Sequence, residues 1–180
     1  MEHTLQQFDA ITAKCRNVFI NKTHDYGTSW RILRLSSLTD QLYIKAWRIR
    51  SIEEKGVQQV SDSVSDEYLG LVNYSIIALI QESLPEDTPL ELPLETVTAL
   101  YDKQLAETRR LLQQKNHDYG EVWREMRVSS MTDLILSKLL RIRQIEDKLG
   151  ETIASEGVDA NYRDIINYAI FALIKLSEKG

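Results

Sequence analysis

Two copies of one motif, one in each half of the chain, gather the residues best suited to chemistry. The first copy contains Lys22, His24, Asp25, Tyr26, Gly27 and Trp30, and the second contains Lys115, His117, Asp118, Tyr119, Gly120 and Trp123. Lysine, histidine and aspartate beside an aromatic pair suit a site that holds an anionic, ring-bearing ligand. The histidine and aspartate would approach its reacting end, so the candidate catalytic residues are His24, Asp25, His117 and Asp118.

The same motif also suits a purely structural loop after a first helix. Gly27 can end a helix or take a positive φ, and Asp25 can close a turn. Tyr26 and Trp30 can then cover the core. A turn needs neither lysine nor histidine, however, and this favours a ligand site.

A lysine falls at the centre of the apolar face of the second predicted helix in each half. A lysine removed from water must be paired or neutral. One interpretation is a lysine–carboxylate pair in a dry interface that fixes how the two units pack. The other is a basic cluster beside an open pocket between the units, where it would hold phosphates. The residues concerned are Lys45 and Arg48, and their copies Lys138 and Arg141.

The last predicted helix of each half carries an asparagine, Asn73 or Asn167, on its apolar face. A buried amide needs hydrogen-bond partners, and we expect Lys45 or Glu53 to supply them for Asn73. Both asparagines are candidate ligand-binding residues.

A metal site would be asymmetric. Asp164 lies one turn before Asn167, whereas its counterpart in the first copy is Gly70. Mg²⁺ or Mn²⁺ would need several oxygen ligands, and the candidates are Asp164, Glu53 and Glu146. Asp40 and Asp133 are weaker evidence for a site, because each lies three residues after a serine, Ser37 or Ser130, which is the spacing of a capping box.

The helices that position these residues come in two equal sets. From His24 to Lys55, 18 of 32 residues are identical to those from His117 to Lys148. Apolar periodicity predicts helices near 5–21, 37–55 and 66–82, and again near 94–115, 130–149 and 161–178. We therefore predict an all-α fold in which two tandem three-helix repeats, 1–82 and 95–180, pack with pseudo-twofold symmetry through their last helices. All three prolines fall in a linker over 83–94.

Composition narrows the class of protein. Apolar residues make up 43% of the chain and charged residues 27%, as in an ordinary globular domain. The net charge of −5 argues against direct binding of nucleic acid. One cysteine allows neither an internal disulfide nor a cysteine-based zinc site. The absence of a long apolar run and of a signal peptide predicts a cytoplasmic protein without a membrane segment.

Four motifs together resemble a known family. They are Lys-x-His-Asp-Tyr-Gly-x-x-Trp, Arg-x-Ser-Ser-x-Thr-Asp, Lys-x-x-Arg-Ile-x-x-Ile-Glu and, in the second copy, Asn-Tyr-Ala-Ile-x-Ala-Leu-Ile. The chain resembles the nucleotide modification associated domain type 1 family in both copies. The resemblance implies a helical protein that is linked to nucleotide or base modification by association.

A more distant similarity is to the all-α nucleoside triphosphate pyrophosphohydrolases of the MazG and dimeric dUTPase group. That group binds magnesium through Glu-x-x-Glu and Glu-x-x-Asp motifs. Here the partner position of Asp164 holds Asn161, while the first copy has Glu67 but Gly70. The HD phosphohydrolases need more metal-binding histidines than the three in this chain.

The sequence thus predicts a helical protein that binds a nucleotide or another small phosphorylated ligand. It would be a metal-dependent nucleotide (pyro)phosphohydrolase or an accessory factor in nucleotide modification. It would be a monomer with an internal pseudo-dimer, or a homodimer. The alternative is a non-catalytic interaction module whose repeated polar residues hold one unit against the other.

Overall fold

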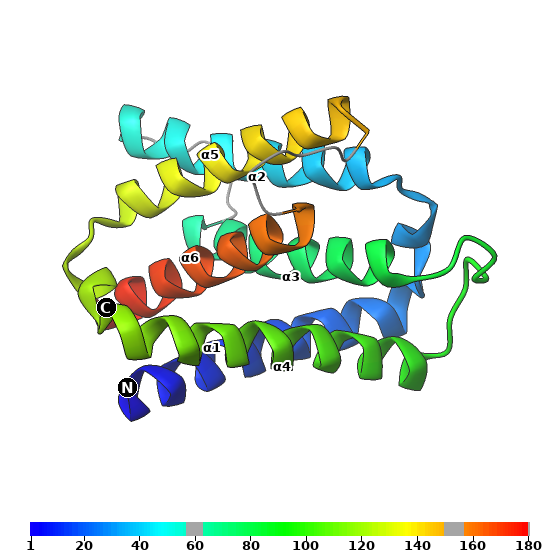
Figure 1. The fold of residues 1–180 in the computed structure, drawn as a ribbon, viewed down its shortest axis with the longest axis horizontal. Coiled ribbons are helices and arrows are strands. Elements are labelled where there is room, and N and C mark those ends of the chain that lie inside the picture. The colour runs from blue at the N-terminus through cyan, green and yellow to red at the C-terminus, as the bar shows by residue number, and fades with distance from the viewer. Residues whose placement is uncertain (57–62, 150–156, 180) are drawn as a thin grey trace.

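The computed structural model describes residues 1–56, 63–149 and 157–179, and within them every regular element is a helix (Figure 1). The elements are α1 (Glu2–Tyr26), the 3₁₀ turn η1 (Ser29–Ile32), α2 (Leu35–Lys55), α3 (Val64–Ser83), α4 (Leu94–Tyr119), the 3₁₀ turn η2 (Val122–Glu125), α5 (Val128–Asp147) and α6 (Val158–Glu178). The prediction of an all-α fold with six main helices is confirmed.

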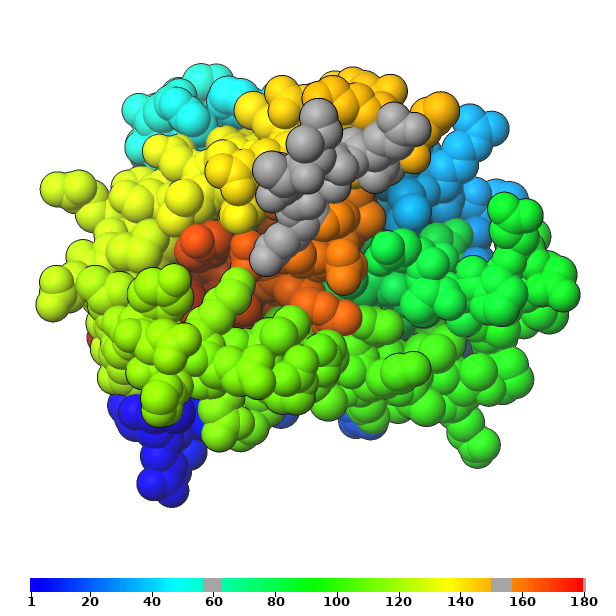
Figure 2. Space-filling view, in the orientation of Figure 1, coloured from blue at the N-terminus to red at the C-terminus, as the bar shows by residue number. Residues whose placement is uncertain are grey.

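The six helices lie in three layers. In Figure 1, α2 and α5 form the upper layer, α3 and α6 the middle one, and α1 and α4 the lower one. The middle helices pack on each other and on both outer layers, as the apolar runs predicted. They are apolar on most sides because each packs against the other middle helix and against both outer layers. Figure 2 shows α6 reaching the surface between α4 and α5.

The first helix of each unit packs mainly on the other unit. α1 contacts α6 more extensively than it contacts α3, and α4 contacts α3 more extensively than it contacts α6. Each three-helix set therefore depends on the other for part of its core. No helix in the described part of the chain is long and apolar enough to cross a membrane.

Matching ion pairs demonstrate the pseudo-twofold symmetry between α1 and α4. Arg16 Nε lies 2.7 Å from Asp102 Oδ1, and Arg109 Nε lies 2.7 Å from Asp9 Oδ1. Adding the repeat offset of 93 to Asp9 and Arg16 gives Asp102 and Arg109. Each pair is thus the symmetry copy of the other.

A second pair of matching contacts joins the upper layer to the middle one. The Thr39 hydroxyl lies 2.8 Å from the Tyr162 hydroxyl, and the Tyr68 hydroxyl lies 2.6 Å from that of Thr132. Both contacts cross from one unit to the other and are buried. They show that some polar residues kept in both copies hold the units together.

The His-Asp-Tyr motif does not lie in a loop, and this corrects the prediction. α1 continues through Tyr26 and ends only at Gly27, whose φ of +64° and ψ of −147° belong to a region that is essentially restricted to glycine. α4 ends in the same way at Gly120, with φ +67°. The polar residues before the glycine simply form the exposed last turn of each helix.

The capping boxes predicted at Ser37 and Ser130 are also wrong. α2 begins at Leu35 and α5 at Val128, directly after the 3₁₀ turns, and neither start has a side-chain cap. The serines already lie inside the first turn. The described helix with a capping box is α3, where Ser63 and Asp66 bond each other's backbone N–H.

Candidate functional site

A cavity of about 680 Å³ opens within the first unit, between α1, η1, α2 and α3. This volume falls in the range of small-molecule sites. Five of the residues predicted to bind a ligand line it, namely Lys22, Tyr26, Trp30, Lys45 and Asn73. All its lining residues lie between Val18 and Ile77, so the cavity is not between the two units as we had predicted.

The basic side of the cavity is formed by Lys22 on α1 and Lys45 on α2. Lys45 is about one-quarter exposed, and its Nζ lies 3.8 Å from Glu67 Oε2. Glu67 forms a closer ion pair with Arg48, at 2.8 Å. Lys22 has no ion-pair partner within the described ranges. One interpretation of Lys45 predicted a carboxylate contact and the other predicted an open pocket. The structure shows both beside Lys45.

Aromatic side chains form another part of the lining. Tyr26 is 73% exposed at the mouth, whereas Trp30 and Tyr74 are half-buried and pack against the core. Lys45 Nζ lies 5.4 Å from the centre of the Tyr74 ring, within the range of a cation–π contact. The cavity thus offers ring faces beside two ammonium groups.

The candidate catalytic pairs lie outside this lining. His24 and Asp25 occupy the exposed last turn of α1, with 3.5 Å between Nδ1 and Oδ1, and the copy at His117 and Asp118 has 3.1 Å. A histidine near a helix C-terminus interacts favourably with the helix dipole. These four residues therefore lie at the surface and outside the cavity lining.

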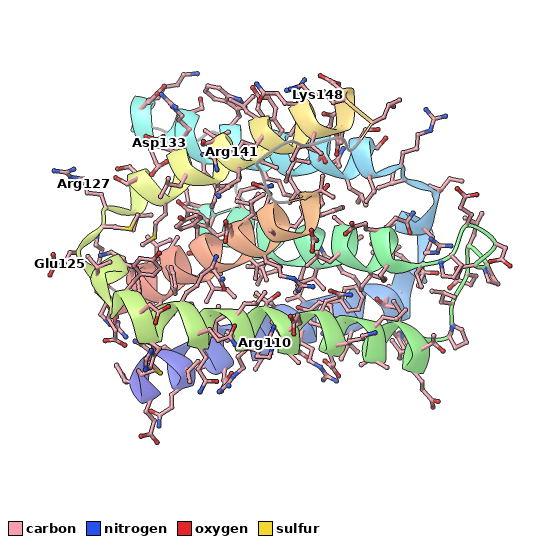
Figure 3. All side chains as sticks on the ribbon, in the orientation of Figure 1. Arg110, Glu125, Arg127, Asp133, Arg141 and Lys148 are labelled. Atoms are coloured by element: carbon pink, nitrogen blue, oxygen red, sulfur yellow. The ribbon has the colours of Figure 1, made fainter. Side chains whose placement is uncertain are left out.

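The equivalent region of the second unit is arranged differently. Lys115 Nζ lies 2.8 Å from Asp164 Oδ1, and Lys138 Nζ lies 2.9 Å from Asp164 Oδ2. Although burial alone would raise the pKa of the Asp164 carboxyl, the hydrogen bonds from the two lysines hold that pKa below its ordinary value. Arg141 is an exposed residue of α5 (Figure 3).

The buried asparagines do not bond Lys45 or Glu53, and this prediction is wrong. Asn73 Nδ2 donates to the Cys15 carbonyl at 3.0 Å, and its Oδ1 accepts from the Tyr101 hydroxyl at 2.7 Å. Asn73 therefore ties α3 to α1 and α4, while its side chain also reaches the cavity wall. Asn167 is equally buried, but its Oδ1 has no hydrogen-bond partner among the described residues.

The three acidic candidates for a metal are not grouped with one another in the structure. Glu146 accepts a hydrogen bond of 2.6 Å from Thr39 of the other unit, and partial burial raises the pKa of the Glu53 carboxyl. Both oxygens of Asp164 already contact lysines. Across residues 1–56, 63–149 and 157–179, no three His, Cys, Asp or Glu side chains are grouped to hold an ion.

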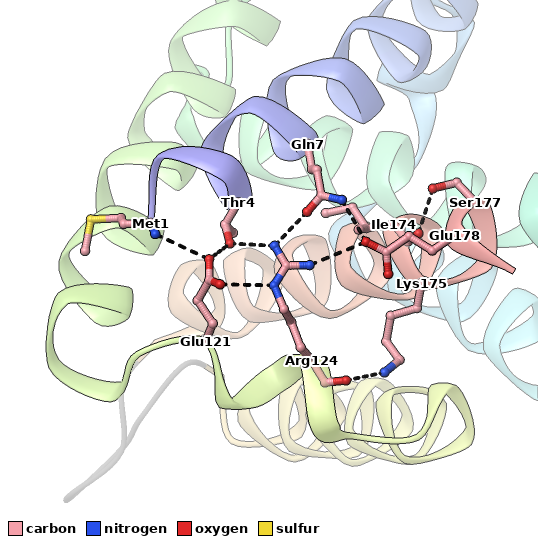
Figure 4. A network of polar contacts seen from close by, with 9 residues as sticks. All are labelled: Met1, Thr4, Gln7, Glu121, Arg124, Ile174, Lys175, Ser177 and Glu178. Carbon is pink, nitrogen blue, oxygen red and sulfur yellow. Dashed lines mark hydrogen bonds and ion pairs between the residues drawn. The ribbon is translucent and has the colours of Figure 1, made fainter.

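Sequence reasoning missed two arginines that are kept beside the tryptophans. Arg124 of η2 donates to Thr4 at 3.0 Å and Gln7 at 2.7 Å, and pairs with Glu121 and Glu178, which fastens the start of α1 to the second unit (Figure 4).

Its copy, Arg31, donates to the carbonyls of Thr88 at 2.8 Å and Pro89 at 3.3 Å, and to Gln81. Both arginines hold a 3₁₀ turn in place. The two arginines occupy equivalent positions in the two repeats, but repetition alone does not separate a structural role from a functional one.

Comparison with known proteins identifies a family. The model of a family described as nucleotide modification associated domain 1 matches residues 22–81 and again residues 115–176. The two segments contain both copies of the motif and cover more than half of the chain. No curated protein and no solved structure matches this chain. The similarity to the pyrophosphohydrolases is not shown.

Proposed function

Because the chain belongs to the nucleotide modification associated domain 1 family, we propose that it binds a nucleotide or a similar phosphorylated, ring-bearing ligand in the cavity of its first unit. One observation carries the proposal. Lys22, Tyr26, Trp30 and Lys45 come from three separate elements and line a single cavity. All four are repeated in the second half of the chain, as Lys115, Tyr119, Trp123 and Lys138.

The chemistry of the lining matches the two ends of such a ligand. The ammonium groups of Lys22 and Lys45 would contact its phosphate, since charge-assisted hydrogen bonds are the stronger ones. The rings of Tyr26, Trp30 and Tyr74 would contact its base, because stacking on aromatic side chains tolerates different bases.

The proposal is limited to binding. Hydrolysis would need an acid, a base or a metal at the bound phosphate. His24 and Asp25 lie outside the lining, and of the two acids within it Asp66 accepts from the backbone N–H of Ser63 and Glu67 pairs with Arg48. A binding role is also compatible with the alternative of a non-catalytic module. It differs from that alternative in requiring a bound ligand.

Isothermal titration provides the test. The parent protein is titrated with nucleoside 5′-monophosphates and with the matching nucleosides, with and without Mg²⁺. We expect the monophosphates to bind more tightly than the nucleosides. Lys22→Ala should weaken monophosphate binding by roughly 10- to 100-fold, the value of one charge-assisted hydrogen bond.

The internal repeat supplies the control. Lys115→Ala removes the equivalent lysine of the second unit, which contacts Asp164 and not the cavity. This variant should bind as the parent does. If no monophosphate binds the parent, or if both alanine variants bind equally well, the proposed function is wrong.

A further inference from the structure

The two units differ in where they carry the carboxylate that faces the repeated lysine. After the one-residue slip between the copies, Glu67 and Gly70 of α3 correspond to Asn161 and Asp164 of α6. Each unit thus has one acid at one of two positions a helical turn apart. The acid contacts Lys45 in the first unit and Lys138 in the second.

In the second unit, two lysines hold one carboxylate between them. Lys115 contacts one oxygen of Asp164 at 2.8 Å, and Lys138 contacts the other at 2.9 Å. The carboxylate is mostly shielded from solvent, with 15% of the side chain exposed. Two ammonium groups on one carboxylate are contacts that also suit a small oxyanion, and here the chain supplies the carboxylate itself.

In the first unit, the same two lysines are present without that carboxylate. Lys22 and Lys45 line the cavity, and Gly70 forms part of its wall. A Cβ atom at Gly70 would lie only 3.1 to 3.2 Å from Cδ, Cε and Nζ of Lys45. The end of the Lys45 side chain therefore lies directly over the backbone of Gly70. The second unit carries the Asp164 side chain at the equivalent position.

Glu67 only partly replaces the missing group. Its Oε2 is 3.8 Å from Lys45, whereas its Oε1 is 2.8 Å from Arg48. Glu67 is thus bonded mainly to Arg48. Among the described residues, Lys22 has no ion-pair partner and Lys45 has only the longer contact with Glu67.

We infer that the oxyanion of the ligand lies over Gly70 between Lys22 and Lys45, where the second unit places its own Asp164 carboxylate. The inference rests on the proposed function, because it concerns the same cavity, and it fixes the orientation of the ligand. It also sets the stoichiometry at one ligand per chain, since the second unit is filled by Asp164.

Exchanging the two residue pairs tests the inference. Glu67→Asn with Gly70→Asp gives the first unit the second unit's pair, and Asn161→Glu with Asp164→Gly does the reverse. Neither exchange changes the net charge. The first should lower the affinity for AMP at least about tenfold, and the second should add a second AMP site per chain in isothermal titration. Parent-like binding in both variants would overturn the inference.

A measurement without ligand guards against loss of folding. Gly70→Asp and Gly70→Asn introduce side chains of the same shape, but only aspartate supplies a charge to the lysines. We expect Gly70→Asp to unfold at a higher temperature than Gly70→Asn. Equal unfolding temperatures would show that Lys22 and Lys45 do not form an anion site, and would refute the inference.

Different probes separate this inference from the proposed function. Adenosine, AMP, adenosine-5′-carboxylic acid and inorganic phosphate are titrated into the parent and the first-unit exchange. If phosphate binds only the parent but AMP binds no better than phosphate, the anion position stands and the nucleotide proposal fails. If AMP binds both proteins equally, the nucleotide proposal stands and the anion position is wrong. Binding of the 5′-carboxylic acid as tightly as AMP would identify any oxyanion, rather than phosphate alone, as the recognised group. If no probe binds the parent, both proposals fail.

Discussion

Tyr101→Phe is expected to destabilise the protein through a single lost hydrogen bond. Tyr101 is fully buried, and its hydroxyl donates to Asn73 Oδ1 at 2.7 Å. The phenylalanine ring would keep the stacking on Phe19, whose centre lies 4.5 Å away, and would create almost no space. The variant therefore isolates the hydroxyl. It leaves a buried amide oxygen without a donor, at a cost of about 1–3 kcal/mol.

Denaturant and thermal unfolding measure this cost. For a domain of this size, about 2 kcal/mol corresponds to a decrease in Tm of roughly 4–8 °C. Tyr119→Phe serves as the control, because Tyr119 is on the same helix and is 77% exposed. It should change the free energy of unfolding by less than about 0.5 kcal/mol. If Tyr101→Phe changes it equally little, Asn73 does not depend on this bond and the reasoning fails.

Three further predictions use the same measurements. Phe8 is the symmetry counterpart of Tyr101, so Phe8→Tyr should donate to the unpartnered Oδ1 of Asn167 and stabilise by about 0.5–1.5 kcal/mol; destabilisation would contradict this placement. Burial raises the pKa of the Glu146 carboxyl in the folded state, and the stability that its protonation provides is lost as pH rises through that pKa. Glu146→Gln should therefore raise the Tm near pH ~7.5 but not near pH ~4, and a lower Tm at the higher pH would refute it. Gly120→Ala should cost about 1–3 kcal/mol from its positive φ alone, since its surroundings are open; an unchanged free energy of unfolding would contradict the strain.

The repeat and the apolar periodicity were enough to predict the fold, but not the ends of the helices. Periodicity stops where a helix leaves the core, so the last turn of α1 up to Tyr26 carried no apolar signal. Gly27 indicates a break in the helix, but a glycine that ends a helix and a glycine within a loop give the same signal in a sequence. Likewise, Ser37 looked like a cap because the sequence does not show that η1 runs directly into α2.

The candidate site was predicted in part for a similar physical reason. Helical spacing gives the direction in which Lys45 points, but not which neighbouring helix it meets. We expected the other unit, whereas the structure places Glu67 and Gly70 of the same unit beside it. Contacts such as Thr39 with Glu146 cross between the copies, and no local pattern in one sequence reveals them.

The packing of each unit's first helix on the other unit affects how the sequence of this protein can evolve. Two separate copies of a single repeat would have to pair as identical subunits, and any substitution would then appear on both sides of the axis at once. In one polypeptide the two sides mutate independently, while the ten residues of 84–93 keep them together. The Glu67–Gly70 and Asn161–Asp164 pairs are such a divergence. Fusion of the two units therefore allows substitutions that stabilise one unit while the other unit keeps its cavity.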